Sequence, residues 1–187
     1  MVTRVQQALT DGKEVWIGDE TTLREFPPLR AAWAKPGQQQ VVVISGRNGR
    51  RVIHGALNLQ SGELVRLVRE RSRTDDSQAF VETLGKVRPE MPKVLIWDNA
   101  PPHHPKRVQE AAAVAQIEVV WLPFRSPELN PCEDLWRQVK GTIAANRTYQ
   151  SLEELTERAV TWLDHLSNDE RLRRSGLRSS KFLWLST

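Results

Sequence analysis

The chain has 187 residues, with 27 Lys and Arg, 23 Asp and Glu, and one Cys. Its length predicts one domain, and a single Cys excludes an internal disulfide and a zinc site made of several thiolates. No apolar run is long enough to span a membrane, the N-terminus lacks the apolar core of a signal peptide, and the net charge of +4 permits a nucleic-acid partner without requiring one.

Three strands are predicted in the first third of the chain. Residues 14–18 form a short apolar run that predicts a strand. Residues 26–37 are rich in Pro and Gly and predict a loop. The β-branched run at 40–45 and the segment 51–59 are joined by a Gly-containing turn, and together they predict a hairpin.

Helices and strands are predicted to alternate in the rest of the chain. The expected elements are a helix from about Asp75, a strand at 93–97, a helix at 105–115, a strand at 117–122, and helices at 130–145 and 151–166. A hairpin followed by this alternation predicts an α/β fold in which helices cover one mixed sheet. Basic residues gather at 66–73 and 171–181, where they suit either a solvated face or contact with nucleic acid.

Acidic side chains end two of the predicted strands. Asp19 follows residues 14–18, and Asp98 follows residues 93–97. If these strands are adjacent and parallel, they lie about 4.8 Å apart and the two carboxylates converge. Their repulsion would then call for a cation such as Mg²⁺ or Mn²⁺, which prefer oxygen ligands. The alternative is that each Asp caps the turn that follows it.

A third carboxylate, Glu133, stands in the first turn of the predicted helix that Asn130 caps. One interpretation is a capping box, with Glu133 turned back on Asn130. Glu133 also shares one helix face with Arg137 and Lys140, at i+4 and i+7. Such a stripe suits a metal ligand beside a phosphate track, and it suits an ordinary solvated face almost as well.

Four motifs stand in order along the chain. They are Asp19-Glu20, Trp33-x-x-x-Gly37, Asp98-Asn-Ala-Pro-Pro-His103 and Ser126-Pro-Glu-Leu-Asn-Pro-Cys-Glu133-Asp-Leu-Trp136. With 34 residues between Asp98 and Glu133, they resemble the catalytic domain of the Asp-Asp-Glu (DDE) transposases. The resemblance extends over about residues 14–155 and is strongest to bacterial insertion-sequence enzymes related to mariner. It implies a ribonuclease H-like fold, with a five-stranded mixed sheet flanked by helices.

The resemblance also implies an activity and a site. The activity is metal-dependent cleavage of DNA phosphodiesters at transposon ends, followed by strand transfer to target DNA. By match of motif, Asp19, Asp98 and Glu133 would be catalytic and would hold Mg²⁺ or Mn²⁺, as two ions. Glu20 should point to the opposite face of its strand, and His103 either approaches the phosphate or orients the Asp98 loop. The candidates for DNA contact are Arg24, Lys35, His103, Arg125, Arg137 and Lys140.

Transposases of this kind usually have N-terminal helix-turn-helix modules, and the strand predicted at residue 14 leaves no room for one before it. We therefore expect residues 1–187 to form a single catalytic domain without such a module. The DNA-reading half would be encoded separately, or the chain is an isolated domain or a decayed copy. A homodimer, a location in the bacterial cytoplasm with the nucleoid, and no membrane contact are expected. The alternatives are a catalytically silent DNA-binding or assembly module, a decayed fragment, and a general ribonuclease H-like nuclease.

Overall fold

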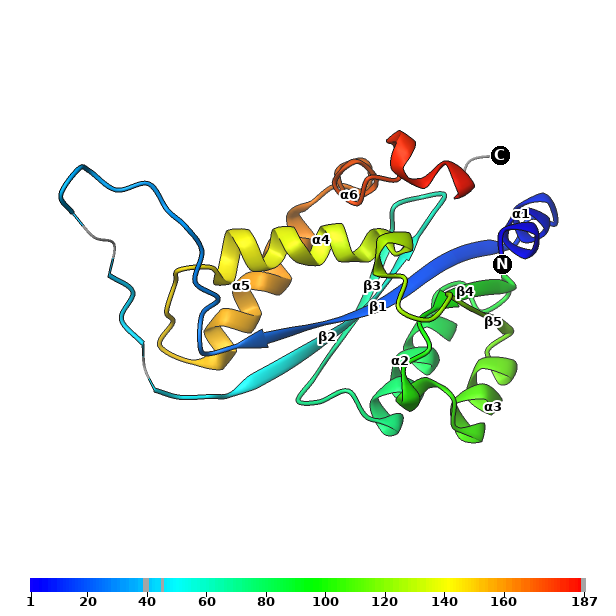
Figure 1. The fold of residues 1–187 in the computed structure, drawn as a ribbon. Helices are drawn as coiled ribbons and strands as arrows, with labels where there is room; N and C mark the ends of the chain where they lie inside the picture. Colours follow the sequence, from blue (N-terminus) through cyan, green and yellow to red (C-terminus); the bar gives the residue numbers. More distant parts are fainter. Residues whose placement is uncertain (39–40, 45, 186–187) are drawn as a thin grey trace.

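A five-stranded mixed sheet forms the centre of the computed structural model, which describes residues 1–38, 41–44 and 46–185 (Figure 1). The strands are β1 (Glu14–Arg24), β2 (Arg50–Asn58), β3 (Leu64–Arg69), β4 (Lys93–Trp97) and β5 (Ile117–Trp121). They lie in the order β3-β2-β1-β4-β5. The first three are antiparallel neighbours, whereas β4 and β5 run parallel to β1. The predicted mixed sheet is therefore confirmed.

Helices cover both faces of this sheet (Figure 1). They are α1 (Val2–Thr10), α2 (Thr74–Gly85), α3 (Lys106–Val114), α4 (Pro131–Val139), α5 (Leu152–His165) and α6 (Asn168–Arg174). Shorter elements are the 3₁₀ turns η1 (Pro101–His103), η2 (Pro127–Leu129) and η4 (Ser180–Leu185), and a π-helical turn, η3 (Lys140–Ala144), that continues α4. Among the described residues, no helix combines the length and the apolar character that crossing a membrane requires.

The alternation of side chains along β1 separates two hydrophobic cores. Ile17 packs in one core with α4 and α5, whereas Trp16 packs in the other with α2 and α3. Because successive strand residues point to opposite faces, Asp19 falls on the α4 side and Glu20 on the α2 side. The two neighbouring acids therefore belong to different layers of the protein.

The pairing of β1 with β4 is shorter than β1 itself. It runs from Glu14 opposite Lys93 to Ile17 opposite Ile96, and β4 ends one residue later. Strand β1 continues to Arg24, paired with β2. The prediction that Asp19 ends a strand is therefore wrong. It nevertheless stands just beyond the last pair with β4, which is the carboxyl edge of the parallel ladder.

The segment between β1 and β2 also differs from the prediction. Residues 41–44 form no strand, and β2 pairs with β1 instead of with this run. The side chains of Val41 and Val43 are 83% and 74% exposed, and among the described residues they belong to neither hydrophobic core. Residues 40 and 45, the ends of the predicted strand, lie outside the described residues. The β-branched content of the run favours extended backbone but supplies no pairing partner.

Several arginines of the two basic runs form ion pairs within the chain. The run at 66–73 begins in β3, which the sequence analysis does not predict, and Arg66 forms an ion pair with Asp164 of α5. In the run at 171–181, Arg173 and Arg178 both pair with Asp169. Ion pairs within the chain therefore account for part of each basic run.

Gly55 makes the close packing beside Asp19 possible. It lies opposite Asp19 in the β1–β2 ladder, and a Cβ there would meet the ring of the buried Trp136 at 2.7 Å. We expect Gly55→Ala to lower the free energy of unfolding by about 1–3 kcal/mol, measured by chemical denaturation. Gly141→Ala is the control, since the atom it would meet is the flexible end of Arg30. Equal stability of the two variants would contradict the expectation.

Candidate active site

Three acidic side chains from three different elements line one pocket of about 290 Å³. Asp19 comes from β1, Asp98 directly follows β4, and Glu133 lies in the first turn of α4. The remainder of the lining comes mainly from residues 122–127. The three acids named in the sequence analysis are thus brought together by the fold.

The start of α4 is tied directly to β1 beside Asp19. The side-chain amide of Asn130 donates to the carbonyl of Gly18 at 3.3 Å, and the thiol of Cys132 donates to the carbonyl of Ile17 at 3.4 Å. The amide oxygen of Asn130 also caps the helix by accepting from the Cys132 N–H at 3.0 Å. Among the described residues, Glu133 forms no capping bond back to Asn130, so the capping-box interpretation is not observed.

Asp19 is a buried carboxyl group among other acids. It is 7% exposed, and within the described part of the chain its Oδ2 has no hydrogen-bond donor. Burial raises the pKa of Asp19 well above its ordinary value, and the charges of Glu20, Glu133 and Asp98 raise it further. A site of this kind favours a proton or a metal cation between its carboxylates.

Asp98 is anchored through one of its two oxygens. Its Oδ1 accepts a hydrogen bond from the N–H of Ala100 at 3.0 Å, while the side chain remains 44% exposed. The next residue, Asn99, donates from its side chain to the carbonyl of Leu122. The loop after β4 is thereby attached to the segment after β5, and both segments line the acidic pocket.

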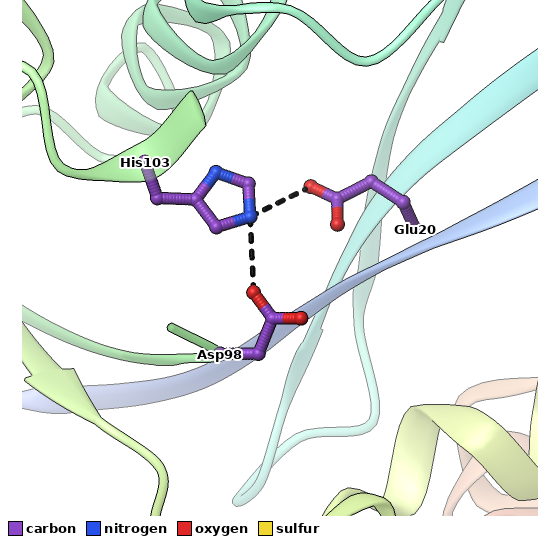
Figure 2. Close-up of side chains that lie close together, drawn as sticks. All are labelled: Glu20, Asp98 and His103. Carbon is purple, nitrogen blue, oxygen red and sulfur yellow. Dashed lines mark ion pairs between the residues drawn. The ribbon is translucent and has the colours of Figure 1, made fainter. Parts of the chain in front are cut away.

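A second cluster lies behind Asp98 and joins it to Glu20 and His103 (Figure 2). The Nε2 of His103 lies 3.1 Å from Asp98 Oδ1 and 3.5 Å from Glu20 Oε1. Burial raises the pKa of Glu20, but the bonds and charges of His103 and His54 outweigh it and bring the pKa to about 2. Glu20 is therefore an anion on the face opposite Asp19, as the strand alternation predicts.

The side chain of His103 is fully buried, so DNA cannot reach it in this conformation. The prediction of a DNA contact at His103 is therefore wrong, whereas its position against Asp98 agrees with an orienting role. Sequence reasoning missed its partners. Glu20 lies opposite His54 in the β1–β2 ladder, and Ser77 of α2 contacts the far side of the His103 ring. A sequence without the strand register does not reveal these contacts.

The other five candidates for DNA contact fall in different places. Arg125 lines the acidic pocket. Arg24 and Lys140 line a separate hollow of about 560 Å³. Arg137 is exposed and pairs with Asp134, and Lys35 is exposed in the segment after β1.

The contacts of His103 with Glu20 and Asp98 make the stability of the metal-free protein depend on pH. Burial lowers the pKa of His103, but Asp98 and Glu20 outweigh it and raise the pKa to about 9. Its contribution to stability is therefore complete below about pH 6.5 and is lost as the pH rises through about 9. The depressed pKa of Glu20 gives a contribution that is complete above about pH 4.5 and is lost as the pH falls toward about 2.

We therefore expect the Tm difference between wild type and His103→Gln, measured in EDTA, to be largest near about pH 5–6 and to shrink toward about pH 9.5. His165→Gln is the control, because His165 is exposed on α5. A difference for His103→Gln that stays constant over this range would contradict the expectation.

The chain is similar to known proteins both in sequence and in fold. The chain is 27% identical over 158 residues to an insertion element IS630 uncharacterized 39 kDa protein of Shigella sonnei, matching 82% of this chain and 45% of that protein. It is also 27% identical over 128 residues to the uncharacterized protein y4pE/y4sA of Sinorhizobium fredii, matching 67% of this chain and 93% of that protein. The chain thus spans about half the length of the first relative.

Solved structures of Mos1 transposase share the fold. The mariner Mos1 paired-end complex with Mg superposes with a TM-score of 0.71 at 17% identity, over 97% of this chain and 56% of that chain. The catalytic domain of Mos1 mariner transposase superposes with a TM-score of 0.64 at 15% identity, over 98% of this chain and 87% of that chain. The five-stranded sheet with flanking helices is therefore the fold of that catalytic domain, as the sequence resemblance implies.

The family model described as DDE superfamily endonuclease matches residues 14–156. This match begins with β1, ends in α5 and includes Asp19, Asp98 and Glu133. The chain belongs to the DDE superfamily endonuclease family.

Proposed function

We propose that this chain is the catalytic part of a transposase, which cleaves DNA phosphodiesters and joins the freed ends to target DNA. The observation that supports this most directly is the single pocket lined by Asp19, Asp98 and Glu133. Membership in the endonuclease family and similarity to an insertion-element protein agree with it. We infer that these three acids are the catalytic residues.

The same three acids are proposed to hold divalent metal. Carboxylate oxygens are the ligands that Mg²⁺ and Mn²⁺ prefer. The buried Asp19 Oδ2 has no donor among the described residues, so it is suited to a cation. Related solved structures include Mos1 complexes with Mg and with Mn. When bound, two such ions would activate the attacking oxygen and stabilise the leaving oxygen.

The protein itself contributes position and charge. The ties from Asn130 and Cys132 hold the start of α4 against β1, which limits the movement of Glu133 relative to Asp19. Arg125 lines the pocket, and we propose that its guanidinium contacts a DNA phosphate there. Asp134 faces away from this pocket, since it pairs with Arg137 and Lys181.

We propose DNA as the partner and two copies of the chain as the working unit. The Mos1 neighbours are complexes with transposon ends, described as paired-end complexes. The match to the Shigella sonnei protein covers 45% of that protein. Recognition of the transposon ends is therefore assigned to sequence outside the matched part, either in the same polypeptide or in a helix-turn-helix chain encoded separately.

Loss of one acid should abolish metal-dependent DNA nicking. We expect Asp98→Asn to lower the nicking rate of a plasmid carrying the element's ends by more than about 100-fold, exceeding the usual effect of residues that only support metal ligands. Asp134→Asn is the matched control and should retain activity. The rate is measured with Mg²⁺, with Mn²⁺ and with EDTA, in which nicking should stop.

Three outcomes would contradict the proposal. Equal nicking by wild type and Asp98→Asn would remove Asp98 from the site. DNA binding without any metal-dependent cleavage, even with a helix-turn-helix module fused to the chain, would favour a silent assembly module. Cleavage of RNA–DNA hybrids without dependence on transposon ends would favour a general nuclease.

Arg125 offers a test of the DNA contact. Removing one phosphate contact lowers affinity for all sequences and reduces the dependence of log Kd on log salt by about one unit. We therefore expect Arg125→Gln to weaken DNA binding and to lower this slope, measured by fluorescence anisotropy in Ca²⁺. Arg107→Gln on α3 is the control. An unchanged slope for Arg125→Gln would exclude the contact.

A further inference from the structure

The cluster behind Asp98 consists of the buried His103 and two partly exposed carboxylates, and two of its members have no role in the proposed chemistry. Glu20, Asp98 and His103 come from three places in the chain, and their ligand atoms lie within 4.8 Å of one another (Figure 2). Glu20 and His103 lie on the α2 side of the sheet, whereas Asp98 also lines the acidic pocket. Asp98 is therefore the residue that joins the two regions.

The ring of His103 is held in one orientation. It stacks on the indole of Trp97, with ring centres 3.7 Å apart and an angle of 19° between the planes. Its Nδ1 lies 3.0 Å from Ser77 Oγ, which donates its hydrogen to the carbonyl of Arg73. The hydroxyl of Ser77 therefore accepts from Nδ1–H, since it has one hydrogen to donate. With Nδ1 and the ring face occupied, Nε2 is directed at the two carboxylates.

Glu20 is held by contacts with two histidines. Its Oε1 lies 3.1 Å from Nδ1 of His54, which is fully buried, and 3.5 Å from Nε2 of His103. A carboxylate between two buried imidazoles balances the positive charge that His103 presents to Asp98. Glu20 therefore contacts His103 from a position outside the residues that line the acidic pocket.

The two carboxylate oxygens of Asp98 have different surroundings. Oδ1 receives the N–H of Ala100 at 3.0 Å and lies 3.1 Å from Nε2 of His103. Figure 2 shows the other oxygen turned away from the imidazole. Because Oδ1 is engaged on two sides, Oδ2 is the oxygen left for the acidic pocket.

We propose that Glu20 and His103 are positioning residues that hold Asp98 through Oδ1, so that Oδ2 is presented to a divalent cation in the acidic pocket. This inference rests on the proposed function, in which Asp98 is a metal ligand. Nε2 of His103 lies 3.1 Å from Asp98 Oδ1 and 3.5 Å from Glu20 Oε1, distances at which an ion pair holds the two carboxylates together without a metal. The cluster thus supports the metal site and is not a second one.

The first test measures Mn²⁺ binding directly, by calorimetry and electron paramagnetic resonance on the protein without DNA. Partners of metal ligands typically contribute about 10–100-fold to affinity. We expect Glu20→Gln, which removes the charge and keeps the shape, to raise the Kd for Mn²⁺ by about 10-fold or more. Nicking by this variant should recover in part at high Mn²⁺. Glu110→Gln, at an exposed position on α3, is the matched control.

The variants separate the two hypotheses. If Asp98→Asn loses Mn²⁺ binding while Glu20→Gln binds as wild type does, the positioning inference fails and the proposed function stands. If Asp98→Asn binds Mn²⁺ as wild type does, the proposed function fails, and the inference fails with it. A lower Tm for Glu20→Gln with unchanged Mn²⁺ affinity would identify a merely structural role and would overturn the inference.

A second measurement needs no variant. In protein with ¹⁵N-labelled histidine, of which the chain has four, the Nε2–H of His103 should give a downfield signal that exchanges slowly with water. Saturating Mg²⁺ should leave this signal in place, since the cation binds on the other side of Asp98. Loss of the signal on adding Mg²⁺, or an anomalous Mn²⁺ peak between Glu20 and His103 in a crystal, would overturn the inference.

Discussion

The parallel ladder between β1 and β4 ends at Ile17 and Ile96, while β1 continues for seven residues beyond Ile17. This difference in length creates the place where the acids meet. Asp19 remains within a strand, held by its pairing with β2, and Asp98 follows the last residue of β4. Asn130 and Cys132, at the start of α4, then bond to the carbonyl groups of Gly18 and Ile17, and Glu133 lines the same pocket as both acids. The early end of the β1–β4 ladder thereby brings together three acids that are far apart in the sequence.

The sheet places like charges on two faces, although Glu20 and Asp19 still repel each other across it. On the α4 side, Asp19, Asp98 and Glu133 share a pocket, and burial with mutual repulsion raises the pKa of Asp19. On the α2 side, Glu20 stands between two imidazoles that offset its charge. Asp98, at the edge of the sheet, is in contact with both sides. The protein thus keeps four carboxylates within a small region without leaving Glu20 to compete for the same cation.

Local patterns predicted much of this arrangement, and the parts that depend on strand register were not predictable. The apolar run before Asp98 matches β4 at 93–97, and the capped run after Ser151 matches α5 within one residue at each end. Both elements are specified by their own residues. By contrast, residues 41–44 have strand-forming side chains but pair with no strand of the described residues. The arginines of β3 interrupt the apolar pattern from which a strand is predicted. The contact of Glu20 with His54 exists because of the β1–β2 register, which no local pattern encodes.

The placement of Asp19 and Glu20 on opposite faces of one strand has a consequence for how this protein tolerates genetic change. A one-residue deletion or insertion between Glu14 and Gly18 would shift the phase of β1 and exchange the two acids between layers. The composition would remain nearly the same, and an acid would still face each layer, but with side chains of the wrong length. Lineages of this protein should therefore accumulate substitutions in the first half of β1 far more readily than changes in its length.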